Sequence, residues 1–413
     1  MKKILPIGIF FLSIVIIFFR FPHLPQNLAF DEIEFAKIAL SLDKASYIAY
    51  TAQANGHSTL YFYVILLFTK IFGMTTLALR LPAALFGVGN GLLFYFIGRK
   101  IFKNNFIVAF STLVLITSRW YFNFARFSFE PTFLLFLELA SIYYLLDYLE
   151  GKKQSLIFSG LCAGLAFHSY LPGRIFFILP VIILLIHKRQ AVGRFIAVTV
   201  IVMLPLLSYL TLHSDTRVQQ TVFLLDRSIS VTKKAVLIGD NIRKTALGFY
   251  TQGDMNGRHN FPGKPAVNPL IALLFSGGLL VSIHQRKKIP QQIFLLYFVL
   301  SLAPVIITDP ADNPSMIRSF TALAPVAYFC GVAANWLIDQ VKSNRKLLVY
   351  GLLGMILLIS AALELRTYYL FQTRVQRNAF EVTCDLQSMV DLQPRTLKDI
   401  PLNCQVTEDL FNQ

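Results

Sequence analysis

Long apolar runs recur along the whole 413-residue chain, and they constrain its fold more than any other feature. Runs of about 18 or more apolar residues are long enough to cross the hydrocarbon core of a bilayer as helices. Only 15% of the residues are charged, whereas a soluble domain has roughly 25%. The sequence therefore predicts an all-α polytopic membrane protein and excludes a soluble protein with a large core.

Eleven membrane-spanning helices are predicted from these runs, the first of them a retained helix because no small-residue cleavage site follows it. They cover residues 4–19, 78–97, 106–118, 131–149, 155–170, 175–187, 194–212, 267–284, 291–307, 318–339 and 346–363. The apolar run 60–72 is too short to span comfortably, so we expect a juxtamembrane or re-entrant helix there. If it does cross, a compensating span lies elsewhere and the count becomes thirteen.

Basic residues account for the net charge of +16, and they gather in every second loop. The clusters are Arg99, Lys100 and Lys103; Lys152 and Lys153; Lys188, Arg189 and Arg194; Arg286, Lys287 and Lys288; and Lys342, Arg345 and Lys346. Positive charge marks cytoplasmic loops, so the charge indicates a cell-membrane protein and no nucleic-acid partner. The expected outer loops are 21–57, 119–130, 171–174, 213–266 and 308–317. A transmembrane domain then covers 1–363, and a short outer tail covers 364–413.

Two acidic residues in different outer loops are the candidate catalytic groups. Asp31 follows the first span, where a carboxylate can take a proton from an attacking hydroxyl. Glu130 can orient the acceptor or hold a cation. The structural alternatives are that Asp31 or Glu32 caps a juxtamembrane helix, and that Glu130 is an N-terminal helix charge ahead of Pro131.

Several cations and aromatic residues on the same side suit an anionic, partly apolar ligand. Arginine matches phosphate bidentately, and aromatic rings can line a sugar or a prenyl chain. Headgroup contacts, snorkelling and an interfacial aromatic belt are the alternatives. The cations are His57, Arg126, Arg174, Arg258, His259 and Arg318, and the aromatic residues are Tyr61, Tyr63, Tyr121, Phe122 and Tyr170.

Other polar and sulfur-bearing residues receive structural roles. Glu138 lies inside a predicted span and is expected to pair with a neighbouring helix. Cys162 and Cys330 lie in spans, whereas Cys384 and Cys404 both lie in the expected outer tail, where a disulfide can form. There is no zinc-type cysteine spacing, P-loop or dinucleotide fingerprint.

At these positions the sequence resembles glycosyltransferase family 39, the type C glycosyltransferases that include protein O-mannosyltransferases and aminoarabinose transferases. The similar stretches are Phe30 to Ala36, Asn55 to Phe62, Arg80 to Gly87, Ala125 to Glu130, Gly253 to Gly263 and Pro314 to Arg318. The family pattern is changed in three places. Glu130 stands where Asp is more frequent, Ser315 replaces a His, and His57-Ser58 replaces the Lys-Pro of lipid A enzymes.

The resemblance implies a type C bundle of about 11–13 transmembrane helices with outer juxtamembrane helices. It also implies an inverting hexosyl- or pentosyltransferase that takes a polyprenyl-phosphate sugar as donor on the outer face of the membrane. Asp31 and Glu130 take the positions of the two acids. The remaining expected substrate-binding residues are Glu32, His57, Tyr61, Arg126, Tyr170, Arg174, Arg258, His259 and Arg318.

Some alternatives stay open at this point. The acceptor, whether lipid, glycan or protein, is not decided by the sequence. No cofactor is required, and a divalent cation held by Asp31 and Glu130 is compatible with the pattern. A transporter or flippase of lipid-linked sugars would use the same cations. Against it, no internal repeat is visible, and the polar residues lie at one face rather than at the midplane.

Overall fold

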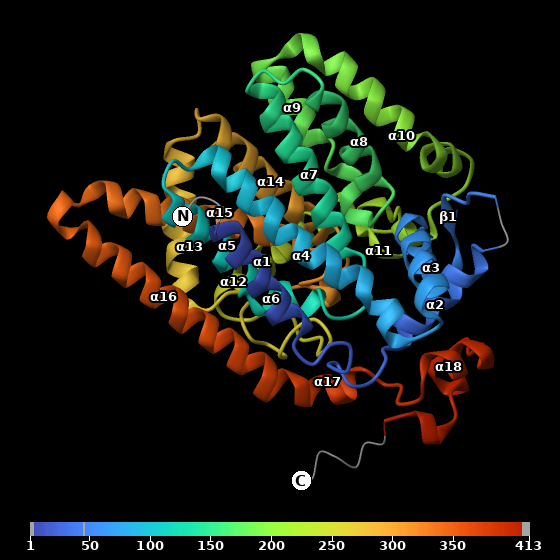
Figure 1. The fold of residues 1–413 in the computed structure, drawn as a ribbon. Helices are drawn as coiled ribbons and strands as arrows, with labels where there is room; N and C mark the ends of the chain where they lie inside the picture. Colours follow the sequence, from blue (N-terminus) through green and yellow to red (C-terminus); the bar gives the residue numbers. More distant parts are fainter. Residues whose placement is uncertain (1–3, 44–45, 407–413) are drawn as a thin grey trace.

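The computed structural model describes residues 4–43 and 46–406, and most of these are helical (Figure 1). The helices of the first half are α1 (Ile4–Phe18), α2 (Phe30–Ser41), α3 (Leu60–Phe72), α4 (Thr76–Ile101), α5 (Asn105–Ile116), α6 (Arg119–Phe124), α7 (Pro131–Leu149), α8 (Ser155–Phe167), α9 (Ile178–His187) and α10 (Val192–Leu212). Two short strands, β1 (Tyr50–Thr51) and β2 (His57–Ser58), pair antiparallel between α2 and α3.

The second half of the chain continues the bundle and ends in a small tail. Its helices are α11 (Thr216–Thr221), α12 (Val231–Tyr250), α13 (Pro269–His284), α14 (Ile289–Ile306), α15 (Leu323–Gln340), α16 (Lys346–Arg366), α17 (Thr373–Ala379) and α18 (Leu386–Leu392). Helices α4, α7, α14 and α15 pack in the middle of the bundle, whereas α10 and α16 run along its outside (Figure 1).

The multi-span architecture predicted from the apolar runs is confirmed. Within the described residues, six helical stretches are long and apolar enough to cross a bilayer: Thr76–Ile101, Pro131–Leu149, Arg189–Leu212, Ile289–Ile306, Phe320–Gln340 and Ser343–Ala379. Six shorter apolar helices accompany them, among them Leu60–Phe72. That segment is a separate helix of 13 residues packed against α2 and α4, and whether it crosses the bilayer stays a prediction.

Three segments differ from their prediction. The last span was expected to end at residue 363, but the helix continues through a π-helical turn into α17, and the buried Glu364 pairs with Arg119 at 3.3 Å. Segment 119–130 was expected to be an open loop, but it forms α6 and a turn in which every residue is buried. The long loop 213–266 contains α12, a helix of 20 residues.

Two buried arginines fasten the first outer loop to the bundle. Arg80 of α4 makes a paired contact with Glu32, from Nε to Oε1 at 2.9 Å and from Nη2 to Oε2 at 2.7 Å. It also donates to three backbone carbonyls between residues 22 and 27. Arg126 donates to Ile16, Ile17 and Phe19 carbonyls, where a helix has unsatisfied acceptors. The position of α2 is therefore fixed from both sides.

Inside the bundle, Glu138 and the free cysteines have the expected structural roles. The Tyr297 hydroxyl of α14 donates to Glu138 of α7 at 2.6 Å, so the predicted pairing between helices is confirmed. Cys330 is buried, and Cys162 is partly buried.

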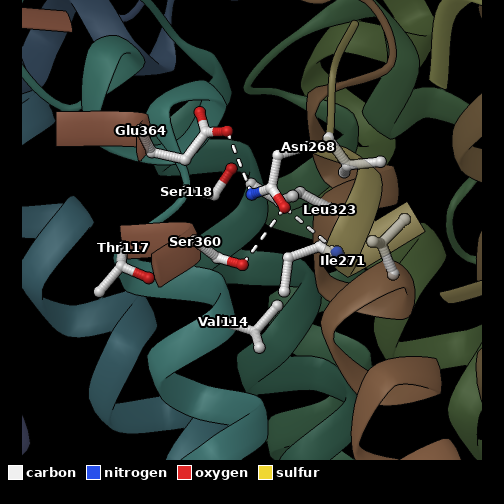
Figure 2. Close-up of a pocket in the computed structure, with 10 residues that line it drawn as sticks. Val114, Thr117, Ser118, Asn268, Ile271, Leu323, Ser360 and Glu364 are labelled. Atoms are coloured by element: carbon white, nitrogen blue, oxygen red, sulfur yellow. Dashed lines mark hydrogen bonds between the residues drawn. The ribbon is translucent and has the colours of Figure 1, made fainter. Parts of the chain in front are cut away.

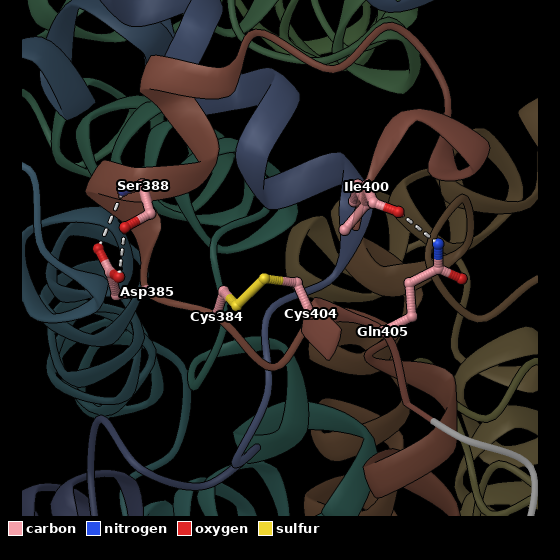
Figure 3. Close-up of a disulfide and its surroundings, with 6 residues drawn as sticks. All are labelled: Cys384, Asp385, Ser388, Ile400, Cys404 and Gln405. Carbon is pink, nitrogen blue, oxygen red and sulfur yellow. Dashed lines mark hydrogen bonds between the residues drawn. A yellow bond between two sulfur atoms is a disulfide. The ribbon is translucent and has the colours of Figure 1, made fainter. Parts of the chain in front are cut away.

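The disulfide expected in the tail is present between Cys384 and Cys404 (Figure 3). It closes the segment that contains α18, which Asp385 caps by accepting from the Ser388 amide at 3.0 Å. Backbone bonds between Leu28 and Val382, at 2.9 and 3.0 Å, tie this tail to the segment that precedes α2. Leu28 and Val382, which are far apart in sequence, therefore lie side by side.

Candidate active site

One cavity of about 380 Å³ is lined by residues from five segments that are distant in sequence. All five come from the segments predicted to lie on one side of the membrane. Its walls are formed by Asp31, Phe129, Tyr170, Arg217, Asp254 to Asn256, Arg258, His259, Ala311 to Ser315, Ile317 and Arg318. A space of this size can hold a sugar with its phosphate.

Asp31 lies in the first turn of α2, and its side chain is 40% exposed. It forms an ion pair with Nη1 of Arg258. Nη2 of the same guanidinium pairs with Glu381, and its Nε donates to the Ala379 carbonyl at 2.9 Å. Arg258 is therefore held between two carboxylates at the cavity wall.

Three arginines, Arg217, Arg258 and Arg318, lie in the cavity wall together with three aspartates, Asp31, Asp254 and Asp312. Arg258 is shared by Asp31 and Glu381. Arg318 pairs with Asp312 at 2.9 Å and also lines the cavity. Arg217 lies over the ring of Tyr170, with its guanidinium carbon 5.7 Å from the ring centre. Guanidinium groups that converge on a cavity are suited to a phosphate ligand.

Glu130 is buried and reaches the cavity only through its neighbours. It is the residue before α7, and its Oε1 lies 3.0 Å from Nδ1 of His57. Nη1 of Arg217 lies 2.9 Å from both ring nitrogens of His57. The three side chains thus form a chain from the buried carboxylate to the cavity, where Arg217 is the exposed end.

The charges of this chain follow from its surroundings. Burial and then the charge of Arg217 lower the pKa of His57, against the opposite effect of Glu130. Burial would raise the pKa of Glu130, but the hydrogen bond from His57 and the charge of Arg217 hold it below its usual value. At neutral pH the pair is a neutral imidazole that donates from Nδ1 to a carboxylate. Nε2 lies 3.1 Å from the carbonyl oxygen of Ala54 and 2.9 Å from Nη1 of Arg217.

The loop 253–263 shapes one wall of the cavity through Asp254. This carboxylate accepts from the amides of Asn256 and Met316, both at 2.8 Å, and lies 3.1 Å from Nδ1 of His259. Gly253 is required here because a Cβ would lie 1.9 Å from the Lys264 carbonyl oxygen. The loop therefore has one tight conformation, which places Arg258 and His259 at the cavity.

The predicted site residues divide into two groups. Asp31, Tyr170, Arg258, His259 and Arg318 line the cavity. The other six do not line it, because they are buried or already paired in the structure. These are Glu32, His57, Tyr61, Arg126, Glu130 and Arg174. Direct substrate contacts were expected for them, whereas the structure gives Glu32 and Arg126 anchoring contacts and pairs Arg174 with Asp215.

Three residues of the site were missed in the sequence. Arg217 was one of many cations in the longest outer loop, and nothing in its spacing set it apart. Its only local signal is Asp215, which caps the short helix α11 by accepting from the Val218 amide at 3.0 Å. Asp254 belonged to a matched stretch without a role of its own. Glu381 lay in a tail that carried no motif.

No metal centre is visible among residues 4–43 and 46–406, since no three His, Cys, Asp or Glu side chains lie close enough together. Asp31 and Glu130 have different partners, Arg258 and His57.

A second pocket of about 20 Å³ lies between α5, α13, α15 and α16 (Figure 2). There Asn268 links Glu364 to Ser360, at 3.3 and 3.2 Å. Its volume suits about one water molecule, so it is not a substrate site.

Residues 56–212 match the family model described as dolichyl-phosphate-mannose-protein mannosyltransferase, which is less than half of the chain. Among solved structures, ArnT from Cupriavidus metallidurans in the apo state aligns with a TM-score of 0.56 and 13% identity, over 91% of this chain and 75% of that chain. The same protein bound to undecaprenyl phosphate aligns with a TM-score of 0.54 and 12% identity, over 91% and 76%. No curated protein matches the chain by sequence.

The chain has the fold of a type C membrane glycosyltransferase. The family resemblance and the fold class indicated by the sequence motifs are thereby confirmed. The family match ends at the C-terminus of α10, so it covers Glu130 and Tyr170 but neither Asp31 nor the arginines of the later loops. The roles of the individual residues are therefore argued from the geometry alone.

Proposed function

We propose that the protein is an inverting glycosyltransferase. It moves a hexose or pentose from a polyprenyl-phosphate donor to a hydroxyl-bearing acceptor at the outer face of the cell membrane. The observation that carries this proposal is a single cavity whose wall contains Asp31, paired with Arg258, and two further arginines, Arg217 and Arg318. The carboxylate suits a hydroxyl that must lose a proton, and the arginines suit a phosphate. The undecaprenyl phosphate bound to ArnT supports a lipid phosphate as the donor's carrier.

The proposed reaction is one displacement at the anomeric carbon. The acceptor oxygen forms the new bond while the bond from the anomeric carbon to the phosphate oxygen breaks. Asp31 takes the acceptor proton, and the polyprenyl phosphate leaves with its charge stabilised by Arg217, Arg258 and Arg318. Because the leaving group is already stabilised as an anion, the reaction needs no separate acid.

Arg258 has to change partners during this cycle. In the structure it pairs with Asp31, and a carboxylate bound in this way is a weaker base. A donor phosphate that enters the cavity competes for the same guanidinium, so donor binding frees Asp31 for the acceptor. Glu130 acts indirectly in this proposal. It orients His57, and His57 in turn contacts Arg217 in the cavity wall.

The test is transfer of radiolabelled sugar from undecaprenyl-phosphate hexoses and pentoses in membranes. Asp31→Asn is expected to lower the rate by about 10²- to 10⁴-fold, which is the usual contribution of a general base. The matched control is Asp43→Asn, which makes the same chemical change at the exposed end of α2 and is expected to act as wild type. Glu130→Gln is expected to weaken transfer by a smaller factor.

Two outcomes would contradict the proposal. One is an Asp31→Asn protein that folds, binds the donor and transfers sugar at the wild-type rate. The other is a wild-type protein that moves the labelled lipid across the bilayer without consuming it, which would identify a flippase.

A further inference from the structure

Glu381 touches both the helix that carries Asp31 and the arginine that neutralises it. One carboxylate oxygen pairs with Nη2 of Arg258, and the other accepts from the Phe30 amide at 3.2 Å. Phe30 is the first residue of α2, directly before Asp31. A single side chain of the C-terminal tail therefore reaches both partners of the Asp31–Arg258 pair.

The backbone around Glu381 is held from two sides. Its carbonyl accepts from the Val406 amide at 3.0 Å, and the next residue, Val382, exchanges backbone bonds with Leu28. The Cys384–Cys404 disulfide closes the same segment three residues later (Figure 3). The carboxylate is thus presented from a fixed frame rather than from a free tail.

The charges explain what such a carboxylate would do. If Arg258 paired with Asp31 alone, the positive and negative charges would cancel, and the carboxylate would have little tendency to accept a proton. With Glu381 on the other side, one guanidinium is shared between two carboxylates, and the group keeps a net negative charge. Glu381 also keeps Arg258 at the cavity wall when the ion pair between Arg258 and Asp31 breaks.

We propose that Glu381 is a positioning residue for the transfer reaction, acting through Arg258. This proposal rests on the proposed function. Glu381 keeps the guanidinium at the cavity wall, and it weakens the ion pair between Arg258 and Asp31. Its negative charge opposes the donor phosphate slightly, so it favours turnover at some expense of donor affinity.

The test uses Glu381→Gln, which retains an oxygen for the Phe30 amide and removes only the charge. We expect kcat to fall about tenfold and KM for the undecaprenyl-phosphate sugar to fall about threefold, because the base is weaker and one repulsive charge is gone. Binding of undecaprenyl phosphate to the same variant is expected to tighten by a similar factor.

Two further variants separate positioning from structure. Glu381→Asp keeps the charge and is expected to recover most of kcat. Asp391→Asn removes a charge from the exposed face of α18, away from Arg258, and is expected to leave both constants unchanged.

Several results would overturn the proposal. They are an unchanged kcat in Glu381→Gln, a rise in KM together with the fall in kcat, or failure of that variant alone to fold, which would assign Glu381 a structural role. A wild-type protein that consumes no donor would reject the proposed function itself, and this proposal with it. The wild-type assay therefore distinguishes the two failures.

Discussion

Single residues at this site work mainly by holding other residues. Arg258 is shared by Asp31 and Glu381, and Arg217 rests on a histidine that Glu130 orients. In both cases a carboxylate away from the cavity centre fixes a cation at its wall. This arrangement lets a cavity keep several like charges close together before the anionic ligand arrives, since each cation has a neighbouring counter-charge.

The buried His57–Glu130 pair predicts that the folded protein becomes less stable at acidic pH. The pKa of His57 is lowered from its usual value near 6.5, so below that pH the unfolded chain binds a proton that the folded protein does not. The pKa of Glu130 is lowered too, which adds a loss at more acidic pH. The free energy of unfolding must therefore fall as the pH drops below about 6.5. We expect His57→Gln to show a smaller decrease in thermal midpoint between pH 7.5 and 5.5 than wild type, measured in detergent.

The control for this prediction is His213→Gln, because His213 is exposed and makes no contact with Glu130. Its midpoints should decrease with pH as in wild type. An equal decrease in the wild type and in His57→Gln would mean that other groups dominate the acid response.

Several of the residues that line the cavity can be predicted from the sequence. Asp31, Tyr170, Arg258 and Arg318 were predicted because ionisable and aromatic residues in outer loops are unusual in a membrane protein. Arg217 and Glu381 could not be predicted, since each acts through a partner 160 or 123 positions away. Glu32 and Arg126 carried the right residue types, yet their side chains are used for anchoring. A sequence does not show which of two similar charges is already satisfied.

Among the elements, α2 and the tail together determine where Asp31 lies in the cavity wall. Helix α2 is short, and it is fixed by Arg80 through Glu32 and by the tail through Phe30. Helices α2 and α18 also pack together at the same edge of the bundle (Figure 1). The position of Asp31 therefore depends on elements from both ends of the chain.

The disulfide is expected to matter for activity as well as for stability. It closes a loop with a sequence separation of 20, and cross-links of this size stabilise a fold by about 3 kcal/mol in the chain-entropy account. The double variant Cys384→Ser with Cys404→Ser should lower the thermal midpoint of the tail. It should also lower kcat in the same direction as Glu381→Gln, since Glu381 loses its fixed frame.

Cys162→Ala is the control, because this thiol lies in α8, outside the tail. It should change neither quantity. The Cys384→Ser, Cys404→Ser variant could instead keep full kcat while its tail becomes accessible to protease. In that case the ordered tail would not be needed for the reaction.

Most elements of the bundle follow from apolar periodicity alone, and the exceptions have a common cause. Segment 119–130 interrupts its aromatic residues with Arg119, Asn123, Arg126 and Glu130, and it therefore looks like a loop. Its polar side chains are satisfied inside the protein, for example Asn123 by the carbonyls of Arg258 and His259 at 2.9 and 3.1 Å. Likewise the helix past residue 363 contains Glu364, which is neutralised by Arg119. Hydropathy cannot detect a polar residue whose partner is distant in sequence.

The molecule as a whole presents two kinds of exposed surface. Helices α10 and α16 are apolar and mostly unburied. Only 22% and 17% of their apolar membrane-spanning stretches are buried inside the protein. Such surfaces are stable in lipid and costly in water. The loops around the cavity are polar, and they were predicted to share one side of the membrane. The tail packs against the same segments, so its sidedness reports that of the cavity.

This division predicts opposite reactivity at two residues of similar exposure. Leu358 of α16 is 72% exposed and Leu402 of the tail is 82% exposed. In a cysteine-substituted protein, only the thiolate reacts with a maleimide, and a thiolate does not form in hydrocarbon. We expect Leu402→Cys to be labelled in intact cells by a membrane-impermeant maleimide and Leu358→Cys to remain unlabelled even after permeabilisation. Labelling at 358 would place α16 in water. If Leu402→Cys were labelled only after permeabilisation, the tail and the cavity would face the cytoplasm, which would reject the proposed outer-face reaction.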